Sequence, residues 1–401
     1  RLTRLKKFQK RILPTAIMFG GNASGKSSFI QALQFMKNLV TKNDGSVLQT
    51  ELKPYAFAPR ALEVPSTFEV DLYLDGFLYN YSFSCTRSGI LEEKLTKSNS
   101  SSDYVLFHRE GLTFHFLDAK KNDRETQKRD IVAEATDENT LFLSKAISLK
   151  IDEYRPVYDW FNRQLTIIDP QTKFSRFLIF KSHEIMELYN MILPKLDTGI
   201  KSLELEKMSK ADFPIPDDEL DPLIKDIHRD KGTEAMLVHQ NRFLFITIKE
   251  DGTEEFSRLI SVHKDEAGNE YTLGMEEESD GTRRTLDLIP AFCVAAPGNI
   301  KRTFFIDEID RSLHTELIQT LYECFFDRRR EGSVDQIIAT THDLALIDQA
   351  LFRRDEMWAF ERKNQGTILF SFSDFLDARH DSDLRNSYRQ GRMGGVPVFD
   401  L

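Results

Sequence analysis

Residues 20–27 read Gly20-Gly21-Asn22-Ala23-Ser24-Gly25-Lys26-Ser27. This stretch follows the apolar run 16–19 and opens an amphipathic segment from Ser28 to Val40. A buried strand, a glycine-rich turn and a helix N-terminus in this order predict a nest of backbone N–H groups that binds a polyphosphate. A glycine-rich turn with an incidental lysine is the plain alternative, and the strand before and the helix after argue against it.

Two side chains of this loop have expected roles in binding a nucleotide and its metal ion. We expect Lys26 to reach the β- and γ-phosphates of a nucleotide and the Ser27 hydroxyl to ligate Mg²⁺. The expected cofactors are therefore ATP and Mg²⁺. The residues expected to bind ATP are Gly20, Gly21, Asn22, Ala23, Ser24, Gly25, Lys26, Ser27 and Ser28.

Length and composition indicate a globular protein with more than one core. The chain has 401 residues, with 40% hydrophobic and 29% charged residues, which favours two lobes. Its apolar runs are far shorter than a membrane span, and no leader begins the chain, so we expect a cytoplasmic protein without a membrane partner. Cys85, Cys293 and Cys324 are too few and too scattered for a disulfide framework or a zinc cluster.

The charge balance is acidic, with one local exception. A net charge of −10 argues against a surface that wraps nucleic acid everywhere. Near the start, however, six cations fall within eleven residues, and they leave DNA open as a partner. A solvated face, or residues that reach the nucleotide, would explain this run equally well. The six are Arg1, Arg4, Lys6, Lys7, Lys10 and Arg11.

After the first helix the apolar pattern changes to period two. Phe68, Val70, Leu72 and Leu74 alternate with polar residues, and Asp75-Gly76 predicts a hairpin turn. The alternation continues through residues 77–83, and residues 105–107 and 112–116 are further candidate strands. The sequence therefore predicts an antiparallel β-lobe.

From about residue 120 to residue 230 the pattern becomes helical and heavily charged. A proline-rich acidic stretch, 213–222, is expected to break the helices as a loop. The expected helices are 131–135, 141–147, 154–165, 177–193 and 199–208, and strands are expected to return at 236–239, 243–248 and 258–262. We interpret the middle of the chain as a compact helical insertion.

A second candidate phosphate contact follows these strands. Ser279-Asp280-Gly281-Thr282 precedes an apolar helix through Leu286, Ile289 and Phe292. Ser279 fits an N-cap position. A phosphate at this helix start would meet N–H donors, a hydroxyl and a flexible glycine.

Two more strands end in polar residues that suit a nucleotide site. The apolar run 303–306 ends in Asp307-Glu308, and the run 336–340 leads into His342. In a parallel sheet the ligand lies at the carboxyl ends of the strands, which places both ends beside the phosphate loop. We expect Asp307 to hold Mg²⁺ through its water shell, and Glu308 to accept a proton from the attacking water. His342 could sense the γ-phosphate or orient that water, although a lone histidine after a strand is more often structural.

Together these motifs resemble a known family. The series GGNASGKSS, ESDGTRR, FFIDEIDRSLH and IATTHD resembles the ABC-type ATPase heads of SMC and DNA-repair proteins and of the overcoming-lysogenisation-defect nucleases. It is more similar still to the RloA/AbiL-like ATPases of bacterial restriction and phage-defence loci. The resemblance extends to PSTFEV, YNYSFSC, ILEEKL, FRRDEMWAFER and SYRQGRMGGVP.

The resemblance implies a fold, an oligomeric arrangement and roles for particular residues. It implies an α/β ABC-ATPase (SMC-like) head with an antiparallel β-lobe and a helical insertion, divided as 1–118, 119–234 and 235–401. Such heads form head-to-tail homodimers or higher oligomers that trap ATP between one subunit's phosphate loop and the other's signature. The signature acting in trans would be Ser279, Asp280, Gly281 and Thr282, with Asp310 in the D-loop and His342 as the switch histidine. Transporters have Leu-Ser-Gly-Gly-Gln where this chain has Glu-Ser-Asp-Gly-Thr.

The expected function is a regulatory ATPase in anti-phage defence. The 59 residues that follow His342 are fewer than a TOPRIM nuclease domain needs, so the effector is expected to be a separate protein, and the resemblance suggests a TOPRIM-type nuclease such as RloB. The alternative is a DNA-structure-binding clamp related to SMC and repair heads. A transporter ATPase and a small-molecule kinase fit less well, because the middle segment is charged and embedded in one head, and because a kinase has no use for ESDGT.

Overall fold

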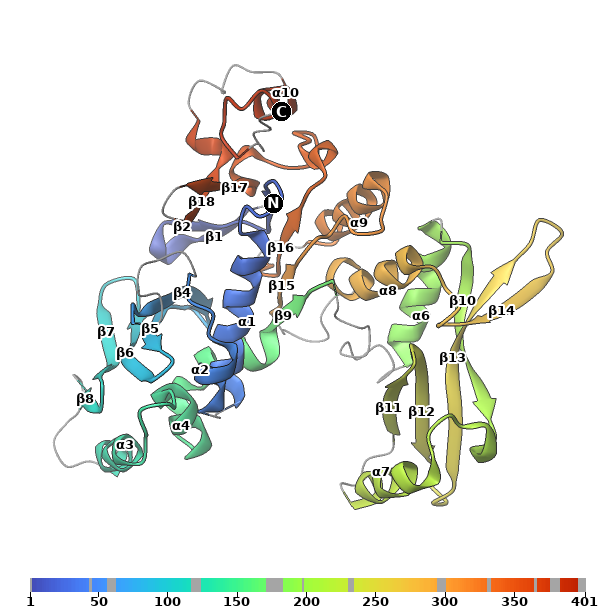
Figure 1. The fold of residues 1–401 in the computed structure, drawn as a ribbon, viewed down its shortest axis with the longest axis horizontal. Coiled ribbons are helices and arrows are strands. Elements are labelled where there is room, and N and C mark those ends of the chain that lie inside the picture. Colours follow the sequence, from blue (N-terminus) through green and yellow to red (C-terminus); the bar gives the residue numbers. More distant parts are fainter. Residues whose placement is uncertain are drawn as a thin grey trace. The chain divides into compact units, whose positions relative to one another are not determined.

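The computed structural model describes residues 2–42, 45–55, 63–116, 124–170, 183–196, 198–229, 234–293, 301–329, 333–363, 366–375 and 383–395 (Figure 1). The chain divides into two compact units. Unit 1 contains Arg1–Ile168, Ala296–Glu308 and Arg330–Leu401, and unit 2 contains Asp169–Ala295 and Ile309–Arg329. Among the described residues, no helix combines the length and apolarity that a membrane crossing requires.

A six-stranded sheet forms the centre of unit 1. Its strand order is β18-β17-β3-β16-β15-β9, and every neighbouring pair is parallel except the β17–β18 hairpin. Isoleucine, phenylalanine and alanine fill its central strands, as expected for a sheet covered on both faces. The strands are β3 (Thr15–Phe19), β9 (Leu165–Ile168), β15 (Thr303–Ile306), β16 (Gln336–Thr341), β17 (Met357–Lys363) and β18 (Gly366–Ser371). The mixed α/β class is confirmed.

Helix α1 (Lys26–Lys42) packs one apolar stripe against the core of unit 1. Ile30, Phe35 and Leu39 from this stripe are buried with residues of a five-stranded antiparallel sheet, which confirms the predicted β-lobe. Asp75 and Gly76 both have positive φ, 51° and 85°, as a type I′ hairpin turn requires. The lobe strands are β4 (Ser66–Leu74), β5 (Phe77–Thr86), β6 (Gly89–Ser98), β7 (Asp103–Glu110) and β8 (Thr113–His115).

Short helices surround this core. Near the N-terminus, β1 (Thr3–Leu5) and β2 (Lys10–Ile12) form an antiparallel pair around the 3₁₀ turn Lys6–Phe8. Besides α1, the α-helices described in unit 1 are α2 (Ser46–Glu51), α3 (Arg124–Glu134), α4 (Phe142–Ser148), α5 (Arg155–Asp159) with the π-helical turn Trp160–Gln164, and α10 (Leu384–Arg389).

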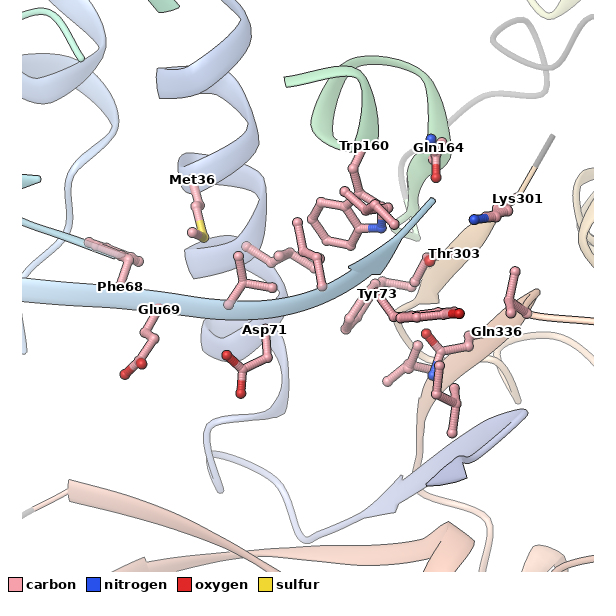
Figure 2. A pocket seen from close by; sticks show the side chains of 18 of the residues that line it. Met36, Phe68, Glu69, Asp71, Tyr73, Trp160, Gln164, Lys301, Thr303 and Gln336 are labelled. Atoms are coloured by element: carbon pink, nitrogen blue, oxygen red, sulfur yellow. The ribbon is translucent and has the colours of Figure 1, made fainter. Parts of the chain in front are cut away.

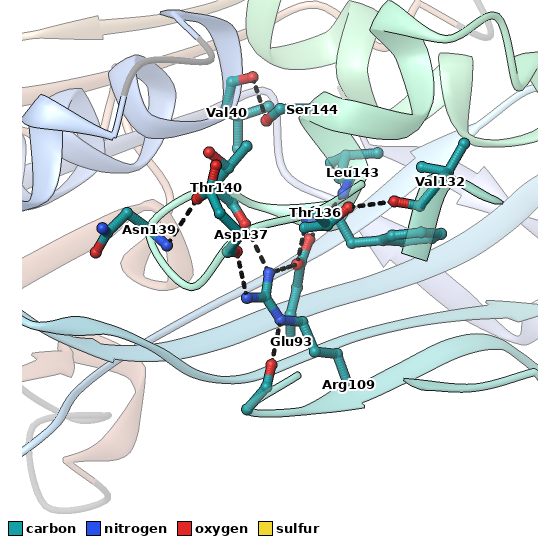
Figure 3. A network of polar contacts seen from close by, with 12 residues as sticks. Val40, Glu93, Arg109, Val132, Thr136, Asp137, Asn139, Thr140, Leu143 and Ser144 are labelled. Carbon is teal, nitrogen blue, oxygen red and sulfur yellow. Dashed lines mark hydrogen bonds and ion pairs between the residues drawn. The ribbon is translucent and has the colours of Figure 1, made fainter. Parts of the chain in front are cut away.

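A fully buried ion pair ties α4 to the β-lobe (Figure 3). Arg109 Nη1 lies 3.8 Å from Glu93 Oε2, and neither side chain is exposed. Glu93 also accepts hydrogen bonds from the backbone N–H groups of Phe142 and Leu143 at 2.6 and 3.0 Å, while Arg109 donates to the Thr140 carbonyl at 2.6 Å. Buried charges are tolerated when they are paired and bonded in this way, so the network fixes the start of α4 against β6 and β7.

Unit 2 combines a second antiparallel sheet with helices. The strand order is β10-β13-β12-β11, and β14 also pairs with β13. Helix α7 packs Leu220 and Ile224 onto Leu244 and Phe256 of this sheet. The strands are β10 (Ile200–Met208), β11 (Glu234–His239), β12 (Arg242–Ile248), β13 (Glu254–Lys264) and β14 (Glu270–Gly274). The helices are α6 (His183–Ile192), α7 (Asp217–Arg229), α8 (Asp280–Phe292) and α9 (Thr315–Asp327).

Three expectations for the middle of the chain are wrong. Residues 199–208 are expected as a helix, but residues 200–208 form strand β10, because Leu203 and Leu205 repeat with period two and Glu206 pairs with Arg258 on β13 at 2.6 Å. Leu165, expected at the end of a helix, begins β9 of the central sheet. Part of the expected loop 213–222 is the first part of α7, whose acidic first turn suits a helix N-terminus. Residues 177–182 of another expected helix lie outside the described residues.

Candidate functional site

The glycine-rich loop joins the end of β3 to the start of α1 within unit 1. Gly25 has a φ of 103°, which strongly favours glycine. A Cβ added to Gly20 would lie 2.6 Å from Ser24 Oγ, and one added to Gly25 would lie 2.6 Å from Thr367 Oγ1. Thr367, on β18, donates a hydrogen bond to the Ser24 carbonyl at 2.8 Å. The β17–β18 hairpin therefore holds the loop from one side.

Lys26 is enclosed by its own loop. Its side chain is only 5% exposed, and Nζ donates to the carbonyl oxygens of Gly20 and Gly21 at 2.7 and 2.9 Å. Nζ also lies 3.4 Å from His342 Nδ1. Because the ammonium can only donate, His342 Nδ1 accepts, and the neutral ring then carries its proton on Nε2. This tautomer is assigned from the contact geometry.

His342 and Glu308 face each other beyond this lysine. His342 Nε2 lies 4.0 Å from Glu308 Oε1, and both side chains are about one-third exposed, at 35% and 34%. Glu308 has a φ of 49°, an uncommon conformation for a non-glycine residue directly after a strand. Such backbone strain costs on the order of 1–3 kcal/mol and tends to collect at functional sites.

Thr340, on β16, forms hydrogen bonds with both Asp307 and Glu308. Strand β16 lies between β3 and β15, so Thr340 reaches the end of β15. Its hydroxyl donates to Asp307 Oδ1 at 2.6 Å and accepts the backbone N–H of Glu308 at 2.9 Å. Thr340 is fully buried and Asp307 is 5% exposed. The structure therefore brings Lys26, Asp307, Glu308 and His342 to the carboxyl ends of the parallel strands β3, β15 and β16, where ligands of such strands bind.

The chemistry of this edge fits a nucleotide and a divalent cation. Ser24 Oγ is buried in the loop without a hydrogen-bond partner in the described structure, as expected for a group that awaits a ligand. The crowding at Gly20 and Gly25 excludes a Cβ at both positions, and backbone without side chains lets N–H groups approach a phosphate. A buried carboxylate and a serine hydroxyl, from Asp307 and Ser27, are oxygen donors of the kind that Mg²⁺ prefers.

The candidate signature forms the start of α8 in unit 2. Ser279 is the N-cap of α8, as predicted, and accepts a hydrogen bond from the Thr282 N–H at 3.0 Å. Asp280 accepts a bond from Arg283 at 2.7 Å. A Cβ on Gly281 would lie 2.7 Å from the Ser312 carbonyl oxygen, so only glycine fits there. Asp310 lies in the same turn as Ser312, and its carbonyl accepts the Leu313 N–H at 3.3 Å. The candidate D-loop and signature thus touch within unit 2.

The sequence matches one protein-family model over residues 16–348. The description of that model is "AAA domain, putative AbiEii toxin, Type IV TA system". The chain belongs to this AAA-domain family.

Two solved structures are similar to this AAA-domain chain. One is the SMC head domain from Thermotoga maritima, with 12% sequence identity, coverage of 92% of this chain and 96% of that chain, and a TM-score of 0.36. The other is the recombination mediator protein RecF with ATP in the RecFOR pathway, with 12% identity, coverage of 92% and 95%, and a TM-score of 0.24. Among curated proteins, no match is found.

Sequence reasoning missed two residues that support the phosphate site of unit 1 and one residue that supports the candidate signature of unit 2. Thr340 and Thr367 form hydrogen bonds with segments that are distant in the sequence. These bonds depend on strand order, which cannot be read from one sequence. The residue in unit 2 is Glu278, which directly precedes Ser279 and is 7% exposed. It accepts a hydrogen bond from the Ser261 hydroxyl and lies 2.7 Å from His263 Nε2, so these contacts anchor the start of the candidate signature. The sequence does contain a signal for Thr340, because this polar residue follows the apolar run Ile337-Ile338-Ala339 in an expected strand.

Proposed function

We propose that this chain binds and hydrolyses Mg-ATP, and that two copies associate head to tail so that residues 279–282 of one copy complete the phosphate site of the other. The observation that carries the proposal is the contact series from Lys26 to His342 to Glu308, beside Asp307 and Thr340. A phosphate loop alone is compatible with many nucleotide-binding proteins and does not indicate hydrolysis. A carboxylate and an imidazole aimed at the position of a γ-phosphate are what hydrolysis needs.

Each residue has a separate task in this proposal. Lys26 and the loop N–H groups bind the phosphates, while Ser27 and Asp307 hold Mg²⁺. Mg²⁺ neutralises charge on the phosphates. Glu308 accepts the proton of the attacking water, and His342, with its proton on Nε2, donates a hydrogen bond toward the γ-phosphate or that water. Thr340 keeps Asp307 and Glu308 in register without touching the ligand.

ATP-driven pairing provides a means of control. The γ-phosphate adds contacts across the interface that ADP cannot make, so hydrolysis shifts the assembly toward separated copies. We propose that this shift controls a separate effector in an anti-phage defence system of the cytoplasm. The resemblance to RloA/AbiL-like ATPases favours a TOPRIM-type nuclease as that effector. The family description, which names a putative AbiEii toxin and a Type IV TA system, supports this part of the proposal.

A DNA-structure-binding clamp is the second candidate function. Arg4, Lys6, Lys7, Lys10 and Arg11 are all exposed on the β1–β2 hairpin of unit 1, which makes a compact basic surface. If DNA is the partner, ATP should strengthen a salt-dependent mobility shift of duplex DNA. A rate of ATP hydrolysis that is the same with and without DNA would favour the effector-control proposal instead.

The test is the mass of Glu308→Gln in solution. The variant should bind Mg-ATP, hydrolyse it slowly and accumulate the paired form, because the amide cannot accept the proton of the water. Sedimentation with Mg-ATP should give twice the mass found with Mg-ADP. Glu250→Gln, which removes an exposed carboxylate at the turn after β12, is the matched control and should behave like the parent protein. An identical mass of Glu308→Gln with ATP and with ADP would contradict the proposal.

A further inference from the structure

A cavity of about 500 Å³ lies along strand β4 of the β-lobe (Figure 2). Every residue from Thr67 to Leu74 lines it. Side chains of a strand alternate between its two faces, so a cavity on one face would touch only every second residue. Contact with the whole run indicates that the cavity follows the backbone edge of β4.

That edge has unused hydrogen-bonding groups. Among the strands that the structure describes, β4 pairs with β5 alone. The two-residue type I′ turn makes Leu74 and Phe77 a hydrogen-bonded pair, and the pattern then alternates along the strands. Glu69, Asp71 and Tyr73 therefore direct their backbone N–H and C=O groups away from β5, toward the cavity. A nine-residue edge without proline is a template for another strand.

The two sides of the cavity differ in chemistry. Five large apolar residues, Phe29, Leu33, Met36, Trp160 and Phe305, line the cavity, and Figure 2 shows Met36 and Trp160 on the same side of β4. Figure 2 shows Glu69 and Asp71 on the side of β4 that faces away from Met36. Both carboxylates are exposed, and both accept hydrogen bonds from the neutral Asn80 amide, at 2.6 and 2.9 Å. At Glu69 and Asp71, a strand along this edge would therefore meet apolar side chains on one face and negative charge on the other. At the Tyr73 end the lining includes a cation, Lys301, which lies 3.5 Å from Asp75 Oδ1, and Phe8 of the β1–β2 hairpin contacts the Tyr73 ring.

The cavity is separate from the phosphate site. Thr303 and Gln336, which also line it, are the first residues of β15 and β16, whereas Asp307 and His342 follow the last residues of these strands. None of Lys26, Asp307, Glu308 and His342 lines the cavity, although its lining extends to Phe305, two residues before Asp307, and to Phe29, three residues after Lys26.

We propose that the β4 edge binds an extended peptide segment of a protein partner by strand addition. The segment alternates apolar residues, which face α1 and Trp160, with lysine or arginine, which face Glu69 and Asp71. Main-chain hydrogen bonds to the edge supply the affinity, and the alternation supplies the specificity. Cationic residues are favoured over acidic ones, because acidic residues would set like charges directly opposite each other.

The test uses a fluorescein-labelled Val-Lys-Val-Lys-Val-Lys-Val peptide and fluorescence anisotropy with the full chain. The peptide should bind saturably, and a peptide with Glu in place of each Lys should bind at least tenfold more weakly. The matched protein variants are Asp71→Ala and Asp71→Pro. Both remove the carboxylate, but only proline removes an N–H from the free edge, and it leaves the β4–β5 bonds in place. Asp71→Pro should therefore bind at least tenfold more weakly than Asp71→Ala.

A second measurement leaves the protein unchanged. N-methylation of alternate peptide residues should abolish binding for the set that faces β4 and spare the other set, whereas a purely charge-driven contact would lose nothing with either set. Absence of saturable binding, equal loss with both methylated sets, or equal affinity of the two Asp71 variants would overturn the proposal. ATP-independent self-association that Asp71→Pro abolishes, without peptide binding, would also overturn it and would assign the edge to a second copy of this chain.

Discussion

Replacing Thr340 by valine tests how the site is held together. Valine keeps the shape of threonine but removes a hydroxyl that is fully buried, donates to Asp307 at 2.6 Å and accepts from the Glu308 N–H at 2.9 Å. A hydrogen bond to a charged group contributes about 1.5–3 kcal/mol, and an unsatisfied buried group costs about 1–3 kcal/mol. We expect Thr340→Val to lower the free energy of unfolding of unit 1 by about 2–4 kcal/mol. We also expect it to slow ATP hydrolysis roughly 10–100-fold, because Asp307 and Glu308 lose their register.

Thr340→Ser is the matched control. Serine keeps the hydroxyl and loses one methyl group, which costs about 1 kcal/mol. Urea unfolding can be followed by tryptophan fluorescence, because the chain has two tryptophans, Trp160 and Trp358, and both lie in unit 1 with Thr340. Phosphate release measures hydrolysis. If the valine variant were as stable and as active as the serine variant, the hydroxyl would have no role in positioning the carboxylates.

Two further predictions concern single side chains. Lys26→Ala should abolish binding of a fluorescent ATP analogue, whereas Lys42→Ala, in the exposed last turn of the same helix, should leave the affinity unchanged; unaltered affinity in Lys26→Ala would count against the phosphate site. In α8, burial raises the pKa of Asp287 to about 7, against the attraction of Arg284. The folded state therefore holds this proton more tightly than the unfolded state, so the contribution of Asp287 to stability is greatest below pH 4 and falls as the pH rises toward 7. Asp287→Asn should thus stabilise the protein most above pH 7 and least near pH 4 in urea unfolding, and a gain independent of pH would contradict this.

The local motifs could be predicted from sequence because each depends on neighbouring residues. The glycine-rich loop between β3 and α1, the Asp75-Gly76 turn and the Ser279 cap all involve residues a few positions apart. The hydrogen bonds of Thr340 and Thr367 could not be predicted, because they join segments 33 and 343 residues apart. They depend on strand order, which no local pattern contains.

Strand β10 was a different kind of error. Residues 200–208 carry charges at many positions, as the preceding segment that is rich in helices also does. The period-two signal of Leu203 and Leu205 was present but short. It becomes decisive only when β13 is available as a partner, since an isolated strand cannot satisfy its backbone groups. The free edge of β4 likewise depends on which strands pair, and no residue type in β4 predicts it from the sequence.

The proposal that two copies share each ATP site is tested most directly by mixing two inactive variants. Ser279→Arg should bind ATP but fail to hydrolyse it, because its arginine blocks the site of the neighbouring copy, and Lys26→Ala should not bind ATP in its own site. A mixture contains sites built from the intact Lys26 of one variant and the intact Ser279 of the other. We predict that phosphate release returns on mixing to a substantial fraction of the parent rate. If the mixture stayed as inactive as its two components, while both were folded and Ser279→Arg bound ATP, the shared site would be contradicted.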